Sequence, residues 1–325
     1  MSMSKHSYLS LGPSGFHRIA YTDWGDATSR HVVICVHGLS RNGRDFDFLA
    51  RALESRCRVV CPDVVGRGDS EWLADKSGYT FGTYLADAAA LIARLTTPPR
   101  TSFLGELHRQ LRTRLGETLA PQRLDWIGTS MGGLIGMLLA AKPGSPIRRL
   151  VLNDVGPLVP WNALLRLSAT AHATRFADRG AAEAQLREAC APFGLDHEAQ
   201  WTHLFEYGIE QDDDGSFVLR FDPALVQLQR TPDRELPLGP DFLRGVDVWS
   251  AWDAVTCPVL VLRGAESDVL LPDTVARMRA RPNVHVVEFP GVGHAPALMN
   301  ALQIGVVREF LLAGDDEIAR SVEPG

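Results

Sequence analysis

Short apolar runs recur along the chain, and each is followed by a segment with the spacing of an amphipathic helix. The runs are rich in Val, Ile and Leu, end in Gly or Asp, and lie at residues 31–38, 57–66, 123–128, 147–156, 257–264 and 283–291. Near-continuous apolarity is typical of strands that are covered on both faces, as in a parallel sheet. Alternation of such strands with helices favours right-handed crossover connections. The pattern therefore predicts an α/β fold.

The beginning of the chain has a different pattern. Residues 7–26 (SYLSLGPSGFHRIAYTDWGD) indicate two strands joined by a turn between Gly12 and Gly15, which would form an antiparallel edge of the sheet. Together with the later apolar runs, this hairpin predicts a sheet of about eight strands, most of them parallel.

Two segments interrupt the alternation. Residues 97–122 open with TPPR and then place apolar side chains four apart, which predicts an extra helical insertion that packs on the core. Residues 157–245 lie between two predicted core strands, and a connection this long usually has its own structure and a role over a site. We interpret it as a mainly helical cap (lid) domain inserted after strand 6. The core domain would then comprise residues 1–156 and 246–325.

Composition narrows the function classes. The 325-residue chain carries a net charge of -6, which argues against a nucleic-acid or anionic-membrane surface, because both require concentrated Lys and Arg. It contains no apolar stretch of membrane-spanning length, and residues 1–16 lack the continuous apolar region expected of a secretory signal. Five scattered cysteines do not indicate a disulfide framework. We expect a cytoplasmic protein with a small-molecule substrate and no metal or organic cofactor, and a homo-oligomer is compatible with the sequence.

One glycine-rich bend carries the strongest chemical signal. Residues 128–133 (GTSMGG) fit the pattern G-x-S-x-G around Ser130, with a predicted strand before them and a predicted helix after them. In this context the motif is typical of a nucleophile elbow, whose sharp turn leaves no room for side chains beside the serine. The turn exposes the hydroxyl group at a helix N-terminus, where partial positive charge favours an anion. We predict that Ser130 is a catalytic nucleophile.

A serine nucleophile needs a base, and the base needs a carboxylate that orients it. Asp268 follows one predicted strand and His294 follows the next, in the chain order serine, acid, histidine. Both lie at the carboxyl ends of parallel strands, where sites of open sheets assemble. We therefore predict Asp268 as the acid and His294 as the base. Asp154 and Glu266 are the alternatives for the acid, with a turn-capping and a solvated loop carboxylate as their structural interpretations.

Acyl transfer also requires hydrogen-bond donors for an oxyanion. The residue after the nucleophile, Met131, supplies one backbone N–H group. The second is expected from the loop after the apolar run 31–38, where Gly38 permits close approach and Leu39 carries the N–H group. His37 in the same loop is expected to be structural and to hold the loop by side-chain hydrogen bonds.

Four motifs in this order resemble those of the α/β-hydrolase fold superfamily, in its serine-nucleophile branch of esterases and C–C hydrolases that carry a cap domain. They are HGLSRNGRDF at 37–46, DVVGRGDS at 63–70, GTSMGG at 128–133, and the pair of Asp268 and His294. The resemblance implies an eight-stranded sheet, a cap after the sixth strand and a Ser-His-Asp triad. Serine in place of an aspartate nucleophile argues against haloalkane dehalogenases and epoxide hydrolases. Residues 97–122 depart from the family pattern.

These residues predict hydrolysis of a small to medium, partly apolar carboxylic ester through an acyl-enzyme. Two alternatives stay open, namely a C–C bond hydrolase of ring-fission diketones and a non-catalytic ligand receptor on the same scaffold. The aromatic residues of the predicted cap are expected to form its core, and none is assigned to substrate binding. They are Trp161, Phe176, Phe193, Trp201, Phe205 and Phe217.

Overall fold

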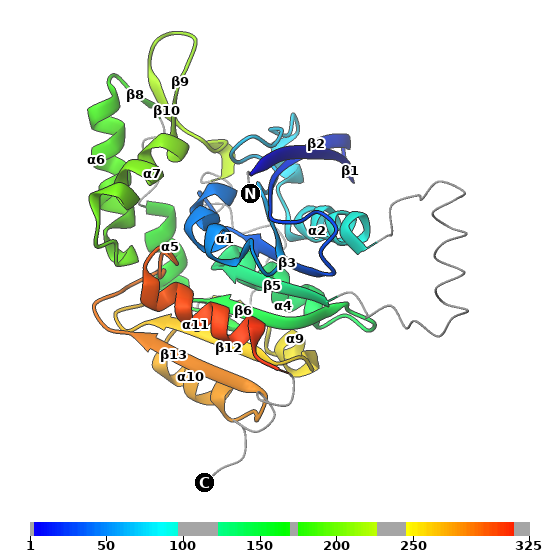
Figure 1. The fold of residues 1–325 in the computed structure, drawn as a ribbon. Coiled ribbons are helices and arrows are strands. Elements are labelled where there is room, and N and C mark those ends of the chain that lie inside the picture. The colour runs from blue at the N-terminus through cyan, green and yellow to red at the C-terminus, as the bar shows by residue number, and fades with distance from the viewer. Residues whose placement is uncertain (1–2, 97–122, 170–174, 226–244, 315–325) are drawn as a thin grey trace, which may run out of the picture.

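The computed structural model describes residues 3–96, 123–169, 175–225 and 245–314 (Figure 1). The helix predicted within residues 97–122 therefore lies outside the described residues. In the described part of the chain, no helix has the length and apolar character needed to cross a membrane.

An eight-stranded sheet forms the centre of the fold, in the order β1-β2-β4-β3-β5-β6-β12-β13. Strands β1 and β2 form an antiparallel hairpin, β2 is antiparallel to β4, and the remaining neighbours are parallel. This arrangement confirms the predicted α/β fold with a mostly parallel sheet. The strands are β1 (Ser4–Gly12), β2 (Gly15–Trp24), β3 (His31–Val36), β4 (Arg58–Pro62), β5 (Arg123–Thr129), β6 (Ile147–Asn153), β12 (Val259–Gly264) and β13 (Val284–Phe289).

Both faces of the sheet are covered, which explains why its strands are apolar at consecutive positions. In β3, Val32 and Ile34 belong to one hydrophobic cluster, whereas Val33 and Cys35 belong to the other. Because successive side chains of a strand point to opposite faces, each face needs its own apolar residues. Side chains of α1 (Asp47–Leu53) and α11 (Ala301–Leu312) join the second cluster. The first includes side chains of α2 (Phe81–Thr96), α4 (Met131–Ala140), α9 (Trp249–Ala254) and α10 (Pro272–Arg279).

A long segment connects β6 to β12, and we call its residues 157–245 the inserted segment. At its base, β7 and β11 pair in antiparallel fashion, while β8, β10 and β9 form a small separate sheet. In Figure 1, α6, α7 and the β9–β10 hairpin stand apart from the large sheet. Its described elements are β7 (Leu158–Val159), α5 (Trp161–Ala169), β8 (Arg175–Phe176), α6 (Arg179–Cys190), η3 (Ala191–Phe193), α7 (Glu198–Gly208), β9 (Ile209–Gln211) and β10 (Phe217–Leu219). The strand β11 (Val246–Asp247) directly follows the segment.

Candidate active site

Ser130 occupies the sharp turn between β5 and α4, with φ 51° and ψ -116°. This positive φ is uncommon for a residue with a side chain, and such conformations concentrate at functional sites. The flanking glycines allow the turn. A Cβ atom at Gly128 would lie 2.2 Å from the carbonyl oxygen of Gly132, and one at Gly132 would lie 2.0 Å from that of Val36. The backbone therefore leaves no room for a side chain at either glycine, as the sequence predicted.

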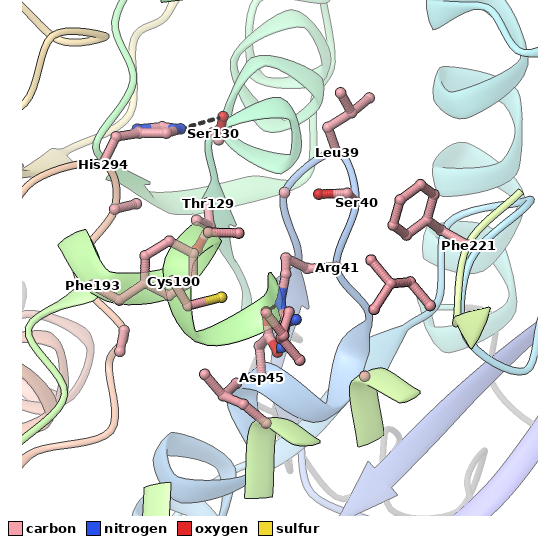
Figure 2. A pocket seen from close by; sticks show the side chains of 18 of the residues that line it. Leu39, Ser40, Arg41, Asp45, Thr129, Ser130, Cys190, Phe193, Phe221 and His294 are labelled. Carbon is pink, nitrogen blue, oxygen red and sulfur yellow. Dashed lines mark hydrogen bonds and ion pairs between the residues drawn. The ribbon is translucent and has the colours of Figure 1, made fainter. Parts of the chain in front are cut away.

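Ser130, His294 and Asp154 form a continuous hydrogen-bonded array. The Oγ atom of Ser130 lies 2.9 Å from Nε2 of His294, and Nδ1 of His294 lies 2.7 Å from Oδ2 of Asp154 (Figure 2 shows the serine–histidine bond). The Asp154 side chain is fully buried. It also accepts hydrogen bonds from the backbone N–H of Gly264 at 2.9 Å and from the hydroxyl of Ser267 at 2.6 Å. These donors hold the carboxylate in place below the imidazole.

Asp268 occupies a different position from the one predicted. Its carboxylate accepts two hydrogen bonds from the guanidinium of Arg166 on α5, at 2.5 and 2.7 Å, and its side chain is 43% exposed. Partial burial raises the pKa of the Asp268 carboxyl, but Arg166 more than offsets this, so the pKa lies below its ordinary value. The prediction that Asp268 is the carboxylate bonded to His294 was wrong. Asp154 holds that position, while Glu266 is exposed.

The correction follows from where each carboxylate leaves its strand. Asp154 comes directly after the last residue of β6, with φ 56°, so its side chain stays at the buried edge of the sheet. Asp268 comes further along the loop after β12, where the chain has already turned toward the inserted segment. Both aspartates follow neighbouring parallel strands, and the path of the backbone decides which one meets the imidazole.

Asn153 ties the loops of the array together. Its side-chain amide donates hydrogen bonds to Oγ1 of Thr129 at 3.0 Å and to the carbonyl oxygen of Pro296 at 2.8 Å. Thr129 precedes the serine and Pro296 lies in the loop of His294. The buried amide therefore helps to set the distance between the two reacting side chains. Sequence patterns did not indicate this role, because Asn153 reads as the polar end of a strand.

Leu39 and Met131, the predicted oxyanion donors, flank the serine. A Cβ atom at Gly38 would lie 3.7 Å from Cβ of Ser130, so the loop after β3 passes close to the nucleophile. Within the described part of the chain, neither N–H group has a hydrogen-bond acceptor. The fully buried Arg67 contacts both residues, donating to the carbonyl oxygen of Leu39 at 2.8 Å and lying 3.6 Å from the sulfur of Met131.

His37 holds the same loop from below, in line with its expected structural role. Its Nδ1–H group donates to the carbonyl oxygen of Gly38 at 2.7 Å, and its Nε2 atom accepts from the N–H of Val64 at 2.9 Å. Complete burial lowers the pKa of the imidazole to about 3. The ring is therefore neutral near pH 7, with both nitrogens used in hydrogen bonds.

A pocket extends from Ser130 and His294 between the core and the inserted segment (Figure 2). The inserted segment supplies most of its apolar wall, namely Leu186, Phe193, Leu204, Leu219 and Phe221. Phe193 is thus a pocket residue; the sequence favoured a core role for each cap aromatic and left open which of them line the pocket. The charged residues Arg41, Asp45 and Arg166 also line the pocket. No sequence pattern singles these three out, because charges on loops and helices are usually solvated.

The arrangement can carry out acyl transfer. A neutral imidazole that accepts from a serine hydroxyl can remove its proton as the oxygen attacks a carbonyl group. The imidazolium that forms is stabilised by the buried carboxylate bonded to its other nitrogen. Ser130, His294 and Asp154 have the required connectivity and distances.

Comparisons with known proteins show the family of this chain. The model of the Alpha/beta hydrolase family matches residues 33–302. The chain is 42% identical to the 3-hydroxybutyrate-oligomer hydrolase of Cupriavidus necator over 306 residues, which is 92% of this chain and 94% of that protein. It is 28% identical to the 2-(acetamidomethylene)succinate hydrolase of Mesorhizobium japonicum over 268 residues, 81% of each chain.

A solved structure shows the same fold over nearly the whole chain. The alpha/beta hydrolase from Novosphingobium aromaticivorans superposes with a TM-score of 0.74 at 32% identity, covering 95% of this chain and 98% of its own. The match of the family model and the relative at 42% identity show that this protein belongs to the alpha/beta hydrolase family and is an ester hydrolase.

Proposed function

We propose that this protein hydrolyses carboxylic esters through an acyl-enzyme, with Ser130 as nucleophile, His294 as general base and Asp154 as the carboxylate that orients it. The hydrogen-bonded array of these three side chains is the observation that carries the proposal. A serine hydroxyl is a weak nucleophile at neutral pH, and it gains reactivity when an oriented imidazole accepts its proton.

The reaction would run in two halves. Ser130 Oγ attacks the ester carbonyl carbon while His294 Nε2 takes the hydroxyl proton, and the N–H groups of Leu39 and Met131 donate to the developing oxyanion. His294 then gives its proton to the departing alkoxide, which leaves as an alcohol. Water attacks the acyl-enzyme with His294 again as base, and the carboxylic acid is released from Ser130.

We propose that the substrates are short 3-hydroxyalkanoate oligomers and that the enzyme cleaves the ester bonds that link their units. Two observations support this class. The relative at 42% identity is named for 3-hydroxybutyrate oligomers. The pocket combines an apolar wall with a few charged groups, which suits a chain of methyl-bearing units linked by ester groups.

We further propose that residues 157–245 act as a cap domain on a core formed by residues 1–156 and 246–325. The apolar side chains that the inserted segment contributes to the pocket support this division, because they would shield the acyl-enzyme from bulk water.

The proposal is tested with Ser130→Ala. Hydrolysis of linear 3-hydroxybutyrate dimer and trimer should fall by a factor of about 10³ or more, because the covalent route is removed. Circular dichroism should be unchanged, and labelling by a fluorophosphonate should occur only in the parent. A variant that keeps its esterase activity would exclude Ser130 from the mechanism. Faster cleavage of a ring-fission diketone than of any ester would replace the ester proposal by C–C hydrolysis.

A further inference from the structure

Arg41 and Asp45 form a nearly buried ion pair in the wall of the pocket. The guanidinium donates from Nε and Nη2 to the two carboxylate oxygens, at 2.9 and 2.6 Å. The side chains are only 10% and 19% exposed, yet both residues line the pocket that contains Ser130 and His294. In Figure 2 the pair occupies a different part of the pocket wall from those two residues.

One guanidinium nitrogen of Arg41 is not used by the pair. Among the described residues, no protein acceptor is bonded to Nη1. Gly208, at the end of α7, lies beside this atom, and an added Cβ there would be 3.3 Å from Nη1. Glycine has no side chain that could cover the donor, and both Gly208 and Arg41 line the pocket. Burial by itself lowers the pKa of the guanidinium, but Asp45 more than offsets this, so Arg41 stays charged.

The charge balance of the pair limits which groups it can bind. Arg41 and Asp45 together have no net charge, so a carboxylate would gain no free cation and would be repelled by Asp45. A hydroxyl group, in contrast, can accept a hydrogen bond from Arg41 and donate one to the remaining lone pairs of Asp45. The surrounding wall is apolar, with Leu186, Leu204 and Leu219, so a polar group placed there needs such partners.

We propose that Arg41 and Asp45 form a subsite that binds the terminal hydroxyl group of the acyl part of the substrate. This inference rests on the proposed hydrolysis of hydroxyalkanoate oligomers and adds the orientation of the chain. The neutral hydroxyl end enters the pocket, and the unit that carries the carboxylate becomes the leaving alcohol. That unit would lie near the Arg166–Asp268 pair, whose side chains are 40% and 43% exposed, so that water can solvate its carboxylate.

The experiment compares two substrate series that differ by one oxygen. The first is the linear dimer and trimer of 3-hydroxybutyrate, and the second is the same oligomers with a butyryl group as the terminal acyl unit. Titration of the acid released, which counts one proton for each ester bond cleaved, gives kcat/KM for each substrate. For the dimer, the trimer or both, we expect the parent to cleave the hydroxylated substrate with a kcat/KM tenfold or more above that of the butyryl analogue of the same length. One satisfied hydrogen bond in a buried site is worth about that factor.

The variant Arg41→Met with Asp45→Leu removes both charges together and avoids leaving one buried charge unpaired. In this variant the ratio of kcat/KM for the hydroxylated substrate to kcat/KM for its butyryl analogue should fall to within about twofold of one. A ratio of one is expected for a site that does not recognise the hydroxyl group by hydrogen bonds. The matched control is Arg179→Met with Glu183→Leu, an exposed ion pair of the same spacing on α6, whose nitrogen and oxygen lie 2.7 Å apart. The control should keep the preference of the parent.

A second variant keeps the ion pair and covers its donor. Gly208→Ala would place a methyl group against Nη1 of Arg41, and the flexible end of Leu186, 2.8 Å away, would have to move. The hydroxyl preference should drop at least about threefold, because the donor would become hidden from the pocket. This variant decides the question if the double replacement does not fold.

The outcomes separate the two proposals. A parent without preference, or a preference that survives in both pocket variants, would overturn the hydroxyl subsite while leaving Ser130-dependent ester hydrolysis intact. Absence of Ser130-dependent hydrolysis of either series, and of p-nitrophenyl butyrate, would overturn the proposed function itself.

Discussion

Nδ1 of His294 lies 2.7 Å from a carboxylate oxygen of Asp154, a residue 140 positions earlier in the chain. The bond joins the loop after β13 to the end of β6, two strands separated in the sheet by β12. Asp154 is fully buried and receives two further hydrogen bonds, whereas Asp268 is engaged by Arg166. The environment of Asp154 suits a carboxylate that must stay ionised and stationary during proton transfer.

Replacement of the two aspartates should therefore have unequal effects. Asp154→Asn should lower kcat for p-nitrophenyl butyrate by about 10³ to 10⁴, because the amide no longer favours the required tautomer of His294. Asp268→Asn serves as the matched control and should lower kcat less than about tenfold, since it loses only a half-exposed ion pair. The reverse ranking would identify Asp268 as the catalytic acid after all.

Gly132 and Gly305 make a second matched pair, because both lie in helices. Gly132→Ala would bring a methyl group within 2.0 Å of the carbonyl oxygen of Val36, so the backbone around Ser130 must shift. We expect a loss of about 3 kcal/mol or more in the free energy of unfolding. Gly305→Ala meets no atom within 4 Å and should gain up to about 1 kcal/mol through helix propensity. Urea unfolding measures both, and equal stabilities would show that the elbow tolerates a side chain.

Arg67 is expected to act as a positioning residue for the oxyanion donors. Arg67→Met removes the hydrogen bond to the carbonyl oxygen of Leu39 and the contact with Met131. We expect kcat to fall about 10- to 100-fold with KM changed less than about threefold, because oxyanion contacts act in the transition state. The rate of fluorophosphonate labelling should fall in parallel, and Arg67→Lys should recover part of it. A rise in KM with kcat unchanged would contradict this role.

His37 should make the fold sensitive to acid. Its pKa is about 3 in the folded protein and near 6.5 when unfolded, so below pH 6.5 the unfolded chain binds a proton that the folded chain excludes. The contribution of His37 to the free energy of unfolding is therefore fully present above pH 6.5. It is lost progressively as the pH falls toward 3, and about 2 kcal/mol is lost by pH 5.

His37→Gln removes this titration, although it weakens the loop. Urea unfolding at pH 7 and pH 5 should show that the parent loses about 2 kcal/mol more than the variant over this interval. Identical pH dependence of the two proteins would contradict the lowered pKa of His37 in the folded state, because the contributions of all other groups cancel in the comparison.

The amino-acid sequence by itself determined the sheet and the serine turn. Continuous apolar runs require cover on both faces, and the alternation with helices leaves a parallel order as the natural arrangement. Gly128 and Gly132 reveal the turn because backbone sterics near Ser130 are local, and a Cβ atom at either site would collide with the main chain. His294 could be placed near the serine because carboxyl ends of parallel strands share one edge.

Only the tertiary structure decided which carboxylate meets His294 and what lines the pocket. Asp154 and Asp268 both follow parallel strands, so chain order cannot separate them, whereas the loop path buries one and turns the other toward Arg166. The Arg41–Asp45 pair looks in the sequence like an ordinary solvated pair at helical spacing. It becomes a buried polar site only because the inserted segment folds over it, and such long-range packing leaves no local trace in the sequence.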